Sequence, residues 1–130
     1  MAGNQTLQTA DFQPIPLDIC VTRGDSPIIP FKLTTPAGAD IDISGGTFTL
    51  TVNTEEDPTD NTNQVFQVTG VLVGGGTTGE FTMQPTTGNT GALNPDLDYF
   101  YDLRMVLASY GDRTIFKGKW LVDQDINKDA

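Results

Sequence analysis

The chain has 130 residues, the length of one domain, and 7 basic against 17 acidic side chains give it a formal net charge of −10. This charge argues against nucleic acid as a partner, because a phosphate backbone is bound by clustered Lys and Arg. The sequence has no His and one Cys, Cys20, which excludes an imidazole triad, an intrachain disulfide and zinc sites of thiolate and imidazole. No apolar run reaches the length of a membrane span, so we expect no membrane partner.

The first 16 residues show no apolar periodicity and end in Pro14-Ile15-Pro16, a sequence that favours extended backbone. We therefore predict an extended N-terminal docking arm over residues 1–16. Besides these three residues, Leu7 and Phe12 are its only large apolar anchors. Because ordering a chain costs roughly 1–2 kcal/mol per residue, we expect a partner to hold the arm, through strand addition to an exposed sheet edge. The arm also lacks the basic start and apolar core of a signal peptide.

Short apolar runs with turn residues between them follow from residue 17. They predict strands over 17–22, 27–34, 41–43, 47–52, 64–73 and 79–84, with polar connections at 53–63 and 85–95. The alternation of Phe48, Leu50 and Val52 with threonines is typical of a half-buried strand. We expect Cys20 to be a small buried side chain, and Val71 and Val73 to be buried after a shift near residue 70.

Two longer runs, 97–107 and 113–122, are joined by a turn at 110–113 that contains Gly-Asp, a dipeptide typical of hairpins. Alternation in the first run places Tyr99 and Tyr101 on one face and Phe100 and Asp102 on the other. Seven or eight short strands without a longer helical pattern predict an all-β fold, a single antiparallel β-sandwich over residues 17–125 followed by a C-terminal tail at 126–130. The predicted core comprises Ile19, Val21, Phe31, Leu33, Phe48, Leu50, Phe66, Val68, Phe81, Met83, Tyr101, Leu103, Met105, Phe116 and Trp120.

Chemically reactive patterns are scarce in this sequence. No phosphate-loop, dinucleotide or nucleophile-elbow fingerprint is present, and the hydroxyl groups have no evident base partner. The carboxylates clustered at Glu55, Glu56, Asp57 and Asp60 leave a calcium site or a glycosidase pair open as alternatives, but we interpret them as a solvated loop. We therefore predict no catalytic residue, no metal site and no cofactor, and hence a protein that is not an enzyme.

Aromatic side chains leave open a carbohydrate-binding module, in which exposed rings stack on sugars. Tyr99, Tyr101, Tyr110 and Trp120 are the candidates for such a surface. Trp120 is in phase with apolar neighbours and is expected in the core. Tyr110, at the hairpin tip, is the one aromatic that we expect to face solvent and contact a ligand.

Several short motifs follow one another in a fixed order. They are Arg-Gly-Asp-Ser at 23–26, Ile-Asp-Ile-Ser-Gly-Gly-Thr-Phe at 41–48, Gly-Glu-Phe-Thr-Met at 79–83, Asp-Tyr-Phe-Tyr-Asp-Leu-Arg at 98–104, and Asp-Arg-Thr-Ile-Phe-Lys-Gly-Lys-Trp-Leu-Val at 112–122. This series resembles the small immunoglobulin-like domains of tailed-bacteriophage virions, notably the N-terminal domain of phage baseplate upper proteins, over about residues 17–125. The resemblance implies an immunoglobulin-like sandwich and a structural adaptor that docks on a virion and assembles as an oligomer.

From this resemblance we expect a non-enzymatic structural subunit, a tail or baseplate adaptor or connector. It would be synthesised in the bacterial host cytoplasm and located in the virion, with other virion proteins and copies of itself as partners. A capsid decoration protein of the phage head and the carbohydrate-binding module are the alternatives. Because residues 1–10 carry no charged side chain, we expect docking to use the neutral arm and the basic end strand. The predicted partner-binding residues are Leu7, Phe12, Pro14, Ile15, Pro16, Lys117 and Lys119.

Overall fold

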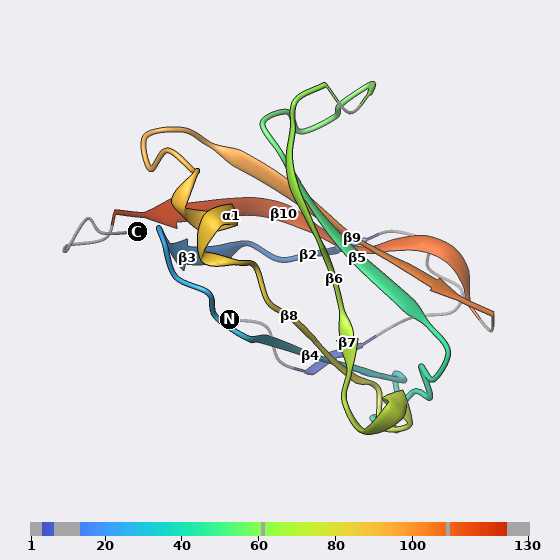
Figure 1. Cartoon of the computed structure of the whole chain (residues 1–130). Coiled ribbons are helices and arrows are strands. Elements are labelled where there is room, and N and C mark those ends of the chain that lie inside the picture. Colours follow the sequence, from blue (N-terminus) through green and yellow to red (C-terminus); the bar gives the residue numbers. More distant parts are fainter. Residues whose placement is uncertain (1–3, 7–13, 61, 109, 125–130) are drawn as a thin grey trace.

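The computed structural model describes residues 4–6, 14–60, 62–108 and 110–124 (Figure 1). These residues form ten β-strands, one turn of 3₁₀ helix at Gly74–Gly76 and one short α-helix. The strands are β1 (Asn4–Thr6), β2 (Ile15–Pro16), β3 (Ile19–Thr22), β4 (Ile29–Thr34), β5 (Thr47–Asn53), β6 (Gln64–Thr69), β7 (Val71–Leu72), β8 (Glu80–Met83), β9 (Tyr99–Leu107) and β10 (Gly111–Asp123), and the helix is α1 (Thr87–Gly91). The predicted all-β class is confirmed.

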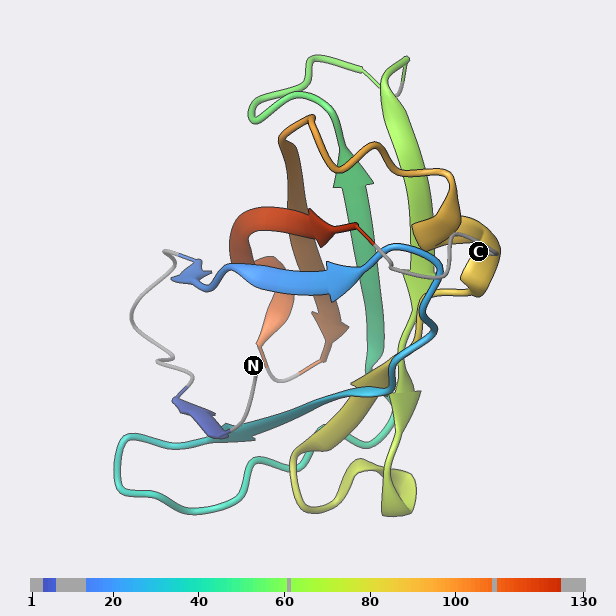
Figure 2. The ribbon, with the colours of Figure 1, turned by 90° about the vertical axis from the view of Figure 1, so that its left-hand side faces the viewer.

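The strands form two sheets that enclose a single core. One sheet has the order β1-β4-β8-β7, and the other has the order β2-β10-β9-β5-β6, with β3 also paired to β10. The expectation of a wholly antiparallel domain is wrong at the N-terminal side, where β1 runs parallel to β4, and β2 and β3 run parallel to β10. Figure 2 shows the blue strands β2 and β3 beside the red strand β10.

Both described parts of the predicted arm pair within the chain. In β1, Gln5 lies opposite Leu33, and in β2, Ile15 lies opposite Phe116. Leu7 and Phe12 fall outside the described residues. That a neighbouring subunit holds the rest of the arm stays a prediction, as does a domain start at residue 17.

Three connections differ from the sequence prediction. Residues 41–43 form no strand, and the chain makes a single bridge there, between Thr34 and Asp40. The loop expected at 85–95 contains α1. The strand expected at 64–73 divides at Gly70, where the chain leaves one sheet for the other.

The change of sheet at Gly70 has a steric reason and a consequence. A Cβ at this position would lie 3.0 Å from Met83 Cε and 3.1 Å from Phe48 Cβ, so a side chain would collide with the core. Beyond Gly70 the strand pairs with β8. Val71 and Val73 are 66% and 40% exposed, and the prediction that they are buried is therefore wrong.

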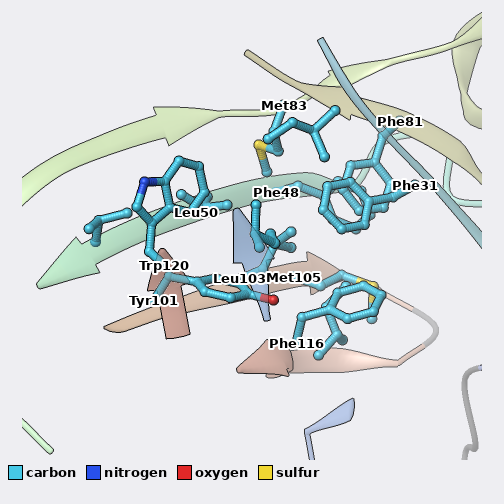
Figure 3. Close-up of a cluster of buried hydrophobic side chains, with 14 of the residues drawn as sticks. Phe31, Phe48, Leu50, Phe81, Met83, Tyr101, Leu103, Met105, Phe116 and Trp120 are labelled. Carbon is cyan, nitrogen blue, oxygen red and sulfur yellow. The ribbon is translucent and has the colours of Figure 1, made fainter. Parts of the chain in front are cut away.

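Aromatic rings from both sheets meet in the core, as Figure 3 shows. Phe81 of β8 stacks on Phe31 at 5.0 Å and on Phe48 of the opposite sheet at 4.1 Å between ring centroids. Trp120 is fully buried, and its ring meets Phe66 edge to face at 5.7 Å. Of the predicted core residues all are buried except Val68, which is partly buried against the core.

Cys20 does not join this core. Because Ile19 and Val21 point inward from β3, the period of two turns Cys20 outward, and it is exposed, with its thiol donating to Asp123 Oδ2 at 3.4 Å. The pKa of the thiol is raised, first by partial desolvation and then by this hydrogen bond and the charge of Asp123. The expectation of a buried Cys20 is wrong.

Candidate docking surface

The outer face of the six-stranded sheet carries polar and charged side chains around one aromatic ring. On β9, Phe100 lies between Asn53 of β5 and Lys119 of β10 in the ladder register. One step further along, Asp102 lies between Thr51 and Lys117. The alternation that buries Tyr99 and Tyr101 therefore presents Phe100 and Asp102 on the outside.

A hollow of about 470 Å³ lies at the end of this face where β2 joins the sheet. Its walls come from the segment before β3, the acidic loop at residues 54–60, β9 and β10. The lining residues are Pro14, Pro16, Asp18, Glu56, Phe100, Lys117, Gly118 and Lys119. Residues from both ends of the sequence thus meet around the half-buried ring of Phe100.

Hydrogen bonds fix the N-terminal segment against β10 at this hollow. The Leu17 N–H donates to the Lys117 carbonyl at 3.1 Å, and the Tyr101 hydroxyl donates to the Leu17 carbonyl at 2.5 Å. The Lys119 N–H donates to Asp18 Oδ1 at 2.9 Å. Burial, followed by the charge of Asp18, raises the pKa of Tyr101, which keeps this hydroxyl protonated as a donor. The wall formed by residues 14–18 is therefore held by backbone and side-chain bonds alike.

A wider groove of about 650 Å³ continues from the hollow along the sheet. The two share Glu56, Phe100 and Lys117. Hydroxyl and amide groups line the groove beside the charges, and Gln67 Nε2 donates to Thr51 Oγ1 at 3.0 Å across the strands. The groove therefore offers both donors and acceptors to whatever lies on it.

The acidic loop lies beside this groove and contributes Glu55, Glu56 and Asp57 to its lining. Lys117 Nζ lies 3.3 Å from Asp57 Oδ1, and all residues from 54 to 60 are exposed. Exposed ion pairs of this kind contribute about 0–1 kcal/mol. The loop is thus joined to β10 by a contact that a partner's charges could replace at low cost.

Asp102 is the half-buried carboxylate of the groove. Burial raises its pKa, and the charges of Lys117 and Arg104 lower it in part. Both cations also contact another carboxylate, since Arg104 Nε lies 2.7 Å from Asp112 Oδ1 and Lys117 pairs with Asp57. Asp102 is therefore a carboxylate whose negative charge is incompletely compensated.

Four predicted docking residues, Pro14, Pro16, Lys117 and Lys119, meet at the hollow. Ile15 does not line the hollow; it is half-buried and packs against the core. Phe100 is not among the residues predicted to contact a partner, although strand alternation places this ring on the face opposite Tyr99 and Tyr101. Gly118 is not among the predicted residues either, although a glycine inside a strand is itself a sign that another segment of backbone approaches closely.

The aromatic surface considered for a sugar does not form from the expected residues. Tyr99, Tyr101 and Trp120 are 4%, 3% and 0% exposed. Tyr110 is half-buried and packs against the core, so its ring is only partly exposed, and its contact with a ligand stays a prediction. Tyr99, Tyr101 and Trp120 are buried because each points to the inner face of its strand. Tyr110 packs against the core at the end of the hairpin.

Within the described ranges no three His, Cys, Asp or Glu side chains gather closely enough to hold a metal ion. In the same part of the chain no helix has the length and apolar character needed to cross a membrane. No protein-family model matches this chain, and no curated protein matches it.

Proposed function

We propose that this chain is a non-enzymatic structural subunit of a tailed-phage virion, an adaptor or connector of the tail or baseplate that docks on neighbouring proteins. The observation that carries the proposal is the convergence of Pro14, Pro16, Lys117 and Lys119 on one hollow. The N-terminal arm reaches the sheet at this place, so a partner that binds the arm also meets the basic end strand and Phe100.

The strand order supports an immunoglobulin-like domain, the fold of the proteins that the sequence resembles. In immunoglobulin domains the strands A, B, E and D form one sheet, and G, F and C form the other, extended by C′ in the variable type. The order β1-β4-β8-β7 opposite β10-β9-β5-β6 corresponds to this arrangement.

A tyrosine at the start of β9 adds to this correspondence. In many immunoglobulin-like domains a tyrosine near the start of strand F hydrogen-bonds through its hydroxyl to backbone a few residues upstream. Here the Tyr99 hydroxyl accepts from the Asn94 N–H at 2.9 Å. This contact supports the interpretation of Tyr99 as such a tyrosine corner.

Imaging tests the assignment directly. Virions labelled with an antibody to this chain are examined by negative-stain electron microscopy. We expect label at the tail or baseplate. Label on the head would instead make the chain a decoration protein, and particles without label would overturn the virion role altogether.

A charge-reversal pair tests the docking surface. We expect Lys117→Glu combined with Lys119→Glu to abolish incorporation into particles, because the two changes lower the net charge by four at a rim that already contains Asp18 and Glu56. The control is Lys32→Glu, which reverses a charge on the other sheet beside Asp40. Incorporation of the double variant at the wild-type level, with circular dichroism showing both variants folded, would place docking elsewhere.

A further inference from the structure

The groove on the outer face of the six-stranded sheet offers a ligand side chains rather than backbone. Its floor is formed by β5 and β9, which are interior strands, so their backbone N–H and C=O groups are already paired in the ladders. A peptide that adds to a sheet needs such backbone groups at an edge. In the ladder register, rows of side chains cross the floor: Gln64, Asn53 and Phe100, then Gln67, Thr51 and Asp102, then Thr49 and Arg104. The floor therefore favours a ligand that bonds to side chains.

Asn53 places an unpaired donor in this groove. The residue is 6% exposed, and its Oδ1 accepts from the Glu55 N–H at 2.8 Å, whereas its Nδ2 has no acceptor within the described residues. Buried polar groups nearly always have a partner. The register of β5 against β6 shifts at this residue, and bulges of this kind re-aim side chains beside functional sites. The Asn53 amide is therefore available to an acceptor on a ligand.

An acceptor and an apolar ring lie beside this donor. Phe100 is directly opposite Asn53, and Asp102 follows Phe100 on the same face of β9. Asp102 is half-buried and accepts no hydrogen bond in the part of the chain that the structure describes, and the cations near it contact other carboxylates. Phe100 is half-buried and presents part of its ring to the groove. Donor, acceptor and ring thus occupy adjacent positions of the sheet.

The charges of the groove favour a neutral ligand. Three carboxylates of the acidic loop and that of Asp102 line it, against the two cations Arg104 and Lys117. An anionic ligand would be repelled by this excess of negative charge. A cation would pair with Asp102 but would bring no acceptor for the Asn53 amide. A neutral molecule with an apolar face and several hydroxyl groups suits the ring, the donor and the acceptor together, and a pyranose sugar has this form.

We propose that this groove is a binding site for a neutral oligosaccharide. The C–H face of one sugar ring packs on Phe100, two neighbouring hydroxyls donate to Asp102, and Asn53 Nδ2 donates to a sugar oxygen. Gln64 and Gln67 line the groove where a second sugar unit extends. The volume of about 650 Å³ is that of a small-molecule site, roughly 300–1,000 Å³. The proposal goes beyond the virion role and does not rest on it.

A glycan microarray tests the proposal with the full chain. The probes are immobilised neutral oligosaccharides of hexose and N-acetylhexosamine units, with sialylated and uronic-acid oligosaccharides as the anionic comparison. We expect the chain to bind neutral probes. An array on which no neutral probe is bound, or on which binding is confined to the anionic probes, would overturn the proposal.

Two variants test whether the groove is the site. Asp102→Asn keeps the size of the side chain but loses a charged acceptor, and Phe100→Ala removes the ring. We expect each to weaken binding of the strongest neutral probe, measured in solution by isothermal titration calorimetry, about tenfold or more. The controls are Asp40→Asn, beside Lys32, and Val106→Ala, an exposed apolar residue farther along the outer face of β9. Both controls should bind as the wild type does.

A third variant tests the donor. Asn53→Asp keeps an acceptor for the Glu55 N–H but replaces Nδ2 by an oxygen, and we expect it to weaken binding as well. Asp102→Asn removes a carboxylate whose ionised form burial disfavours, so it is expected to fold, and it decides the matter if Phe100→Ala unfolds the chain. Undiminished affinity in both Asp102→Asn and Asn53→Asp would overturn the proposal.

Discussion

Asp102 shows how one side chain combines strand phase and electrostatics. It belongs to the outer face of β9, yet its neighbours Thr51 and Lys117 and the groove around it leave it half-buried. Burial raises the pKa of its carboxyl group, and the two nearby cations offset only part of this effect. The ionised form of Asp102 therefore disfavours the folded state.

The sign of the pH dependence follows from this raised pKa. Below the ordinary Asp value near 3.8 the carboxyl is protonated in both the folded and unfolded states, so its ionisation affects neither. As the pH rises from there, the unfolded chain loses the proton first, and stability falls until the folded-state pKa is passed. We expect Asp102→Asn to raise the melting temperature at pH 7 and to have little effect at pH 3.

The difference between the two melting curves isolates Asp102 from other carboxylates. Asp42, Asp60 and Asp112 have lowered pKa values because they accept hydrogen bonds from Ser44, Thr62 and Arg104. These three contribute stability above pH 4 that is lost on acidification, in wild type and variant alike. An Asp102→Asn variant that melts lower than wild type at pH 7 would show that its attraction to Lys117 and Arg104 outweighs burial.

β10 is the element on which the domain is organised. It pairs with β9 along most of its length and with β2 and β3 on its other side. Its interior glycine, Gly118, lies where the chain between β2 and β3 passes closest. A Cβ there would overlap the Leu17 carbonyl oxygen and lie 2.8 Å from Asp18 Oδ1. The N-terminal segment can follow β10 because this residue has no side chain.

Gly118→Ala should therefore displace the N-terminal segment. We expect a destabilisation of about 1–3 kcal/mol, as for other overpacked sites. Faster amide exchange is expected at Leu17 and Lys119, whose N–H groups bond across this contact. The control is Gly88→Ala in α1, where the nearest atom would be Thr86 Oγ1 at 3.7 Å. Unchanged exchange at Leu17 in the Gly118 variant would mean that the backbone adapts without loss of pairing.

At the scale of the whole molecule, two connections join the sheets after β6. The chain crosses at Gly70, where its N–H still bonds to Phe48 while the next residues pair with β8. It returns through α1, whose Thr90 hydroxyl donates to the Asp25 carbonyl at 2.6 Å. The Tyr99 hydroxyl then fixes the end of this return by accepting from Asn94. These contacts hold the connection while the core packs between the sheets.

Tyr99→Phe tests the return connection. Removing the hydroxyl leaves the Asn94 N–H without this acceptor while the buried ring is kept, and we expect a loss of about 1 kcal/mol. For a chain of this length that corresponds to a melting temperature about 3–5 °C lower. Tyr110→Phe is the control for losing a hydroxyl from a partly buried tyrosine. Equal melting temperatures for wild type and Tyr99→Phe would mean that water replaces the tyrosine as acceptor.

The sequence by itself determined the all-β class and most of the core, because alternation with a period of two is a local property of each strand. Phe48 and Leu50 in β5, and Tyr101 and Leu103 in β9, are buried as that alternation predicts. The same rule already placed Phe100 on the outer face. The same alternation also predicts an exposed Cys20, because its neighbours Ile19 and Val21 point inward.

Apart from the hairpin of β9 and β10, which its turn predicts, only the tertiary structure decided which strands pair. The parallel pairing of β2 and β3 with β10 joins residues about a hundred positions apart, and nothing local in either segment specifies its partner. The division at Gly70 is decided by the space that Met83 and Phe48 leave there. The hollow between Pro14 and Lys119 exists because the two ends of the chain meet across Gly118, and a contact of that kind follows from packing, not from the order of residues in either segment.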